Sequence, residues 1–231
     1  MRCPESSKHH HSAAKARAIA SRQEFIQMIE ITLLHGSEIT DYTELIGLWR
    51  IQYFREFPYL YQGTMEYEAK YLAGLVSNPH AVVAVARDNA QIIGFVTALP
   101  LVSDFDIVKE FNAHFQTLNR NIQDYCYIGE IIIHPDYRGN GLALEMTQRI
   151  EQDMQQRGFK GACFLCVVRD PDHPLRPADY LEIDGLCQRA NYIKTDIVSQ
   201  FEWPTIQADG SCRNMQNPMV LWIKAFEAEE S

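Results

Sequence analysis

Hydrophobic and polar residues alternate with two different periods along the chain, and each period indicates one type of element. Residues 28–34 begin with alternating apolar and polar side chains, which is typical of a strand with one face in the core. Other short runs are almost continuously apolar and rich in Val and Ile, as in strands buried on both faces. The pattern predicts strands over residues 28–34, 81–86, 92–98, 125–133, 161–168, 193–203 and 219–226.

Spacings of three and four residues define a second set of segments, which are predicted helices. The spacing is clearest where Leu142, Met146, Ile150 and Met154 recur every four residues. Asp41 is a suitable cap for an earlier helix. The spacing predicts helices over residues 41–56, 65–76, 107–118, 139–157 and 178–189.

The order of these elements predicts a mixed α/β sheet and not the regular alternation of a Rossmann fold. A chain of 231 residues fits one domain, which we expect over residues 25–231. Residues 1–24 are polar and rich in Ala, so we expect a flexible N-terminal tail there. Within it, His9, His10 and His11 form the alternative of a metal-binding cluster.

The net charge of the chain indicates which classes of partner to expect. There are 30 acidic and 21 basic residues, a net charge of -9, and no segment is rich in Lys and Arg. We therefore expect neither nucleic acid nor an anionic membrane as a partner, whereas a cationic substrate such as an amine suits the acidic balance. No apolar run reaches the roughly 18 residues of a membrane helix, and residues 1–22 lack the apolar stretch of a signal peptide. A cytoplasmic protein is predicted.

Six cysteines are scattered along the chain, and two of them, Cys163 and Cys166, form a C-x-x-C motif. This motif could indicate a redox or zinc site. It lies in a predicted strand, however, where a spacing of three places the thiols on opposite faces. No second Cys/His pair follows at zinc-finger spacing. We therefore expect reduced core thiols and no metal.

Residues 128–144 carry the strongest functional signal. A hydrophobic strand leads through a short loop into a helix whose first turn contains Gly139 and Gly141. Helix N-termini present unpaired N–H groups with partial positive charge, and glycines let a ligand approach the backbone, so the segment predicts a site for a diphosphate. The six-residue spacing of a dinucleotide fingerprint fails at Leu144, and the Gly-Lys-Ser/Thr of a P-loop is absent.

Residues 138–143, Arg-Gly-Asn-Gly-Leu-Ala, resemble the acetyl-CoA signature Arg/Gln-x-x-Gly-x-Gly/Ala of the GNAT N-acetyltransferases. Residues 131–138 resemble the strand and loop that precede this signature, and residues 164–180 resemble a bacterial GNAT subgroup of unknown substrate. The resemblance implies a mostly antiparallel mixed sheet of about six or seven strands with helices on both faces. It also implies that a monomer or homodimer transfers the acetyl group of acetyl-CoA directly to a primary amine of a small molecule or protein, in a ternary complex.

The resemblance assigns the cofactor mainly to the backbone. The N–H groups of Gly139, Asn140, Gly141, Leu142 and Ala143 would hold the pyrophosphate of coenzyme A. Arg138 would either add charge there or brace the loop. The backbone of Ile131, Ile132 and Ile133 would bind the pantetheine arm as an added strand does, and a backbone N–H of that strand would hold the thioester oxygen.

Glu130 is a carboxylate inside an otherwise apolar strand, which is costly unless it is paired or used. It is a candidate base or substrate ligand, and the alternative is a structural carboxylate capped by N–H groups. Many GNAT enzymes place an acidic Tyr four residues before a Gly-Phe pair. Here Cys187 occupies that position, before Asn191-Tyr192. Tyr180 and Cys187 are therefore the candidate acids, with solvent as the alternative.

Two further residues, His173 and Arg176, lie in the Pro-rich loop after the strand at 161–168. They are candidate substrate-binding residues, although the loop could simply be a stiff surface connection. The aromatic stretch 49–61 could line an acceptor pocket, but core packing is the simpler interpretation. A second functional hypothesis, supported by Cys187, is a regulatory module that binds acyl-CoA with little turnover. Transfer of a longer acyl group is a third.

Overall fold

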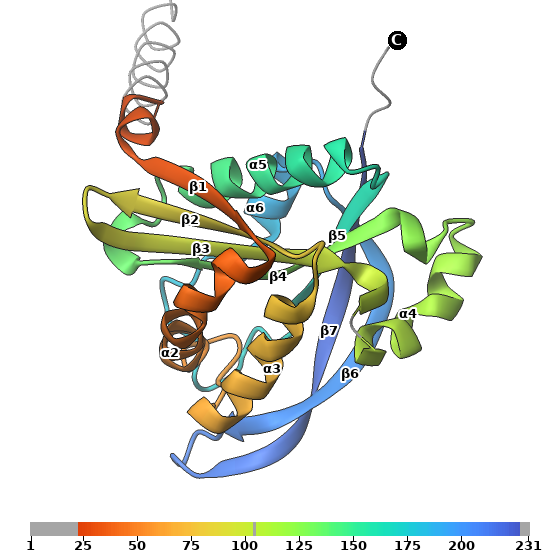
Figure 1. The fold of residues 1–231 in the computed structure, drawn as a ribbon. Coiled ribbons are helices and arrows are strands. Elements are labelled where there is room, and N and C mark those ends of the chain that lie inside the picture. Colours follow the sequence, from red (N-terminus) through yellow and green to blue (C-terminus); the bar gives the residue numbers. More distant parts are fainter. Residues whose placement is uncertain (1–22, 104, 227–231) are drawn as a thin grey trace, which may run out of the picture.

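The computed structural model describes residues 23–103 and 105–226, which form one seven-stranded sheet in the order β1-β2-β3-β4-β5-β7-β6 (Figure 1). Every neighbouring pair is antiparallel except β4 and β5, which run parallel. The strands are β1 Glu30–His35, β2 Val82–Asp88, β3 Gln91–Pro100, β4 Tyr125–Ile133, β5 Gly161–Val167, β6 Ile193–Ile206 and β7 Cys212–Ala225.

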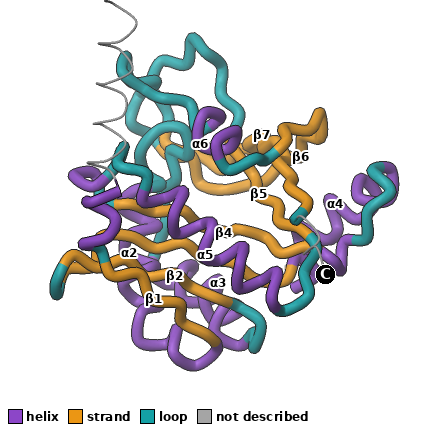
Figure 2. Tube along the Cα trace, turned by 90° about the horizontal axis from the view of Figure 1, so that it is seen from above, coloured by secondary structure: helices purple, strands orange, loops and turns teal. Residues whose placement is uncertain are grey.

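Helices cover both faces of the sheet. Figure 1 shows α5 and α6 above the sheet and α2, α3 and α4 below it, and Figure 2 shows from above how α5 lies across β2, β3 and β4. The mixed, mostly antiparallel sheet with helices on both faces is thus confirmed. The helices are α2 Thr43–Tyr53, α3 Met65–Ser77, α4 Phe105–Thr117, α5 Leu142–Gln156 and α6 Asp184–Arg189.

The two covered faces explain why β2 and β3 are apolar without alternation. Val82 and Ala84 point toward α5, whereas Val83 and Val85 point toward α2 and α3, and all four are fully buried. Asn89 joins β2 to β3 in a left-handed conformation, with φ of +52°, which Asn tolerates better than most residues. The two strands form an antiparallel hairpin.

Several predicted boundaries are wrong. Residues 36–42 form a 3-10 helix, so α2 begins at Thr43 and ends at Tyr53 instead of spanning 41–56. The predicted helix 178–189 is only α6, because Leu181 is 88% exposed and this stretch buries no apolar stripe. The last two strands are longer than predicted, since ladder pairing continues through exposed polar residues that carry no hydrophobic period.

The two C-x-x-C cysteines lie as the sequence predicts. Cys163 packs in the cluster on the α4 side of the sheet and Cys166 in the cluster on the α5 side, so their thiols point to opposite faces. Within the described ranges, no three His, Cys, Asp or Glu side chains gather as metal ligands would. His9, His10 and His11 lie outside the described residues. No helix in the described part of the chain has the length and apolar character needed to cross a bilayer.

Candidate active site

The strands β4 and β5 separate halfway along their length. They pair only where Tyr125, Cys126 and Tyr127 meet residues 161–163, and beyond Tyr127 the two strands have no shared register. On its other edge β4 stays paired with β3, but Gly129 and Glu130 together face the single residue Thr97. This bulge and the separation leave one edge of β4, from residue 128 to 133, open toward β5.

The chain then turns through a 3-10 helix, Pro135–Tyr137, into the first turn of α5. Gly139 and Gly141 have φ of +80° and +87°, a conformation that residues with a Cβ avoid. A Cβ at Gly139 would meet no atom within 4 Å, and one at Gly141 would meet only Ile26, at 3.5 Å. Both glycines therefore face open space, and the backbone conformation requires them.

The N–H groups of residues 139–144, called the "amide cradle" below, lie in the loop and first turn that lead into α5. Gly141 caps α5 without a side-chain acceptor, and among the described residues none accepts a hydrogen bond from these six amides. Unpaired N–H groups and the partial positive charge of a 15-residue helix together favour an anion. The cradle fits a diphosphate of the kind that coenzyme A carries.

Arg138, in the loop between β4 and α5, contacts the end of β4 and residues at and just beyond the end of α2. Its Nε donates to the Ile133 carbonyl oxygen at 2.9 Å, and its Nη1 lies 3.4 Å from Glu56. The guanidinium also lies over the ring of Tyr53, with 5.4 Å to the centroid. Of the two predicted roles, this geometry favours bracing.

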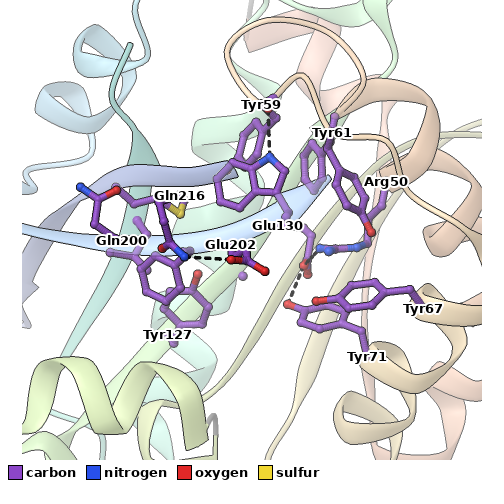
Figure 3. Close-up of a pocket in the computed structure, with 16 residues that line it drawn as sticks. Arg50, Tyr59, Tyr61, Tyr67, Tyr71, Tyr127, Glu130, Gln200, Glu202 and Gln216 are labelled. Carbon is purple, nitrogen blue, oxygen red and sulfur yellow. Dashed lines mark hydrogen bonds and ion pairs between the residues drawn. The ribbon is translucent and has the colours of Figure 1, made fainter. Parts of the chain in front are cut away.

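Glu130 is buried at the bulge of β4 and accepts hydrogen bonds from three side chains (Figure 3). One carboxylate oxygen accepts from Arg50 and, at 2.8 Å, from the Tyr71 hydroxyl, and the other accepts from the Thr97 hydroxyl. These three donors, one of them a guanidinium, hold the carboxylate in a fixed position. The geometry favours the alternative of a structural carboxylate, although its donors are side chains and not N–H groups.

Arg50 joins Glu130 to a second buried carboxylate. Its Nε donates to Glu68 at 2.6 Å, and the Tyr61 hydroxyl donates to the other Glu68 oxygen at 2.8 Å. Burial disfavours the charged guanidinium, yet the neighbouring acidic groups, Glu130 first among them, outweigh burial and raise the pKa of Arg50. The sequence analysis missed Arg50 and Glu68. The available signal was a charged residue on the same helical stripe as the buried Ile46 and Tyr53.

A pocket of about 540 Å³ opens beside this ion network. Its floor is made by Tyr127, Gly129 and Glu130 of β4 with Leu165 of β5, at the point where these strands separate. Aromatic rings form most of its walls. They are Phe54, Tyr59 and Tyr61 near the end of α2, Tyr67 and Tyr71 of α3, and Phe201 and Trp203 of β6.

The β6–β7 hairpin closes the pocket by pairing with the loop after α2. Gln62 N–H donates to the Pro204 carbonyl at 2.8 Å, Ile206 N–H donates to Leu60 at 2.8 Å, and Tyr61 bridges Thr205. The indole N–H of Trp203 donates to the Tyr59 carbonyl at 3.2 Å. The aromatic stretch 49–61 thus serves both predicted purposes, since part of it packs in the core and part lines this pocket.

The structure brings three predicted residues together around Phe57, and neither Phe57 nor any of the three lines the pocket. Tyr180 packs edge-on against this ring with centroids 4.7 Å apart, His173 lies 5.6 Å away, and Arg176 lies over the ring at 5.8 Å. Arg176 is also paired with Glu182 at 2.8 Å. Burial, followed by the charge of Glu182, raises the pKa of Tyr180 to about 12, so the hydroxyl keeps its proton at neutral pH.

The remaining candidate acid, Cys187, lies elsewhere. It is 2% exposed, packs in the core on the α5 side of the sheet and contacts Cys166. The pocket opens on the opposite side, where Tyr127 and Leu165 point. This placement disfavours Cys187 as a proton donor and leaves Tyr180 and solvent.

Comparison with known proteins agrees with this architecture. A sequence model described as the acetyltransferase (GNAT) family matches residues 44–178, more than half of the chain. No curated protein sequence matches. An N-acetyltransferase from Staphylococcus aureus Mu50 is similar in structure, with a TM-score of 0.54 and 12% identity over 85% of this chain and 98% of that one.

Two further solved structures share the fold at low identity. One is Arabidopsis thaliana NAA60 in complex with a bisubstrate analogue, with a TM-score of 0.54 and 12% identity over 86% of this chain and 100% of that one. The other is the ribosomal-protein-S18-alanine N-acetyltransferase from Escherichia coli, with a TM-score of 0.51 and 11% identity over 88% and 98%. With the family match and the amide cradle in place, the chain belongs to the GNAT family of acetyltransferases and is an acyltransferase.

Proposed function

We propose that the protein transfers the acetyl group of acetyl-CoA directly to a primary amine in a ternary complex. The observation that carries this proposal is the amide cradle, which has no acceptor among the described residues and lies where β4 opens away from β5. The aromatic pocket reaches the same opening. Two molecules could therefore meet there at once.

In this proposal the amides of residues 139–144 bind the pyrophosphate, and the open edge of β4 at Ile131, Ile132 and Ile133 pairs with the pantetheine arm. Acetyl-CoA supplies an activated thioester. A backbone N–H of β4 stabilises the charge that develops on the carbonyl oxygen. The backbone of β4 orients the thioester in this step. The side chains of the three isoleucines are therefore not required to be of a particular type.

Direct transfer is supported by the state of the cysteines. None of the cysteines in the described ranges lines the pocket, and Cys126, Cys163, Cys166 and Cys187 are buried. Burial raises the pKa of the Cys126 and Cys163 thiols, which disfavours the reactive thiolate. An acyl-cysteine intermediate is therefore disfavoured.

The reaction balances without a further reagent. The acceptor enters as an ammonium ion and first gives one proton to water. The neutral amine then attacks the thioester carbon, a C–N bond forms, and the C–S bond breaks. The amine loses its extra proton to water in the pocket, and the departing thiolate takes a proton from Tyr180 or from solvent. Glu130 positions Arg50 and Tyr71 in the lining of the pocket and does not itself move a proton.

Incubation with acetyl-CoA and a panel of primary amines should release free coenzyme A thiol in step with acetylated amine. Thiol is measured colorimetrically and the product by mass spectrometry, with amine-free reactions as the control. Acetyl-CoA binding without amine-dependent thiol release from any amine would favour the regulatory module instead. Thiol release only with longer-chain acyl-CoA would show that the transferred group is a longer acyl chain and not acetyl.

A further inference from the structure

We infer that the acceptor is a small primary amine with an aromatic or other apolar body and no carboxylate beside its amino group. This inference rests on the proposed function and names the substrate class of its pocket. The evidence is the aromatic walls of the pocket, the charged side chains that line it, and the position of its floor.

The pocket walls suit an apolar body attached to a cation. Phe54 and Tyr59 stack with centroids 4.5 Å apart, and Tyr59 continues to Trp203 at 6.2 Å. Tyr61 and Tyr67 form a second, edge-on pair at 6.3 Å. Such ring faces stabilise an apolar group that packs against them, and they attract an ammonium group through the ring quadrupole.

The charges of the pocket exclude a substrate carboxylate. In the described part of the chain, Arg50 is the only cation that lines the pocket. Its guanidinium is already bound to Glu68 and Glu130, and its face lies 4.1 Å from the centroid of the Tyr71 ring. Two carboxylates therefore neutralise it, and a third acid would meet an anionic surrounding.

Glu202 makes the pocket favourable for a cationic group. It lies on the β6 side of the pocket, across from Tyr67 and Tyr71 (Figure 3), and accepts a hydrogen bond from the neutral amide of Gln216 at 3.0 Å. Its charge has no cationic partner among the described residues. An ammonium group that enters the pocket would provide the missing positive partner for Glu202.

The volume of the pocket and the position of its floor also suit an aromatic amine. A volume of about 540 Å³ accommodates a bicyclic amine with room for water. The floor at Gly129 and Leu165 lies at the separation of β4 from β5, so an amine that reaches it faces the proposed thioester. The ring system would remain between the aromatic walls.

Tryptamine and L-tryptophan test this inference because they differ only by the carboxylate. In calorimetry of the full chain saturated with coenzyme A, tryptamine should bind at least about tenfold more tightly than L-tryptophan. Ethylamine, which lacks the ring, should also bind at least about tenfold more weakly than tryptamine. Equal affinity for tryptamine and L-tryptophan, or for tryptamine and ethylamine, would overturn the inference.

A pair of variants on β6 separates the pocket charge from the net charge. Glu202→Gln should weaken tryptamine binding about fivefold or more, while Asp196→Asn, exposed on the same strand and outside the pocket, should leave it unchanged. An equal effect of both variants would contradict a role for Glu202. Tight tryptamine binding without thiol release would refute the transferase function alone. Thiol release with other amines and no tryptamine binding would refute the substrate class alone.

Discussion

Gly141→Val is expected to weaken acetyl-CoA binding by at least about 100-fold, the equivalent of one or two hydrogen bonds to a charged group at roughly 1.5–3 kcal/mol each. Gly141 has φ of +87° and caps α5 without a side chain. A branched Cβ at this position strains the turn and fills the space above the amide cradle. Calorimetric titration with acetyl-CoA measures the loss.

Gly158→Val is the matched control for this prediction. Gly158 follows the other end of α5, has φ of +92°, and would place its Cβ in equally open space. Both variants therefore carry similar backbone strain and a similar loss of thermal stability. If Gly158→Val lost acetyl-CoA as Gly141→Val does, or if neither lost it, the cofactor would not be bound at the start of α5.

Arg50→Met is expected to lower the free energy of unfolding by about 3–5 kcal/mol. The substitution leaves Glu68, which is fully buried, and Glu130, which is 2% exposed, without their shared cation. Removing one partner of a buried ion pair costs more than the pair contributes, because the remaining charge stays desolvated. Denaturant unfolding followed by circular dichroism measures the change.

Two further variants test the cause of that loss. Arg55→Met removes an arginine that is exposed just beyond α2, so it should change stability by less than about 0.5 kcal/mol. Arg50→Met combined with Glu68→Gln should be more stable than Arg50→Met alone, because one unpaired charge is gone. A double variant as unstable as the single one would show that Arg50 acts through packing and not through charge.

The parts of the fold that follow from side-chain periodicity could be predicted from the sequence. The stripe of Leu142, Met146, Ile150 and Met154 is the face that α5 buries, and all four are at most 1% exposed. The two glycines of the amide cradle were also predictable, because their positions depend on local backbone conformation. The family and the fold therefore followed from local signals, and so did the position that we propose for the cofactor.

What could not be predicted depends on contacts between distant segments. Arg50, Glu68 and Glu130 come from three separate elements, and no spacing within one element reveals that they meet. The outer half of β7 pairs with β6 through polar residues, so its sequence lacks a hydrophobic period. The pocket forms only because this hairpin pairs with the loop at Leu60 to Gln62.

A crystal structure with bound acetyl-CoA tests the central claim most directly. We predict that the oxygen atoms of its pyrophosphate lie within about 3.2 Å of backbone nitrogen atoms in residues 139–144. The same structure should show the thioester between β4 and β5, facing the aromatic pocket. A pyrophosphate bound elsewhere, with these six amides facing solvent, would contradict the account.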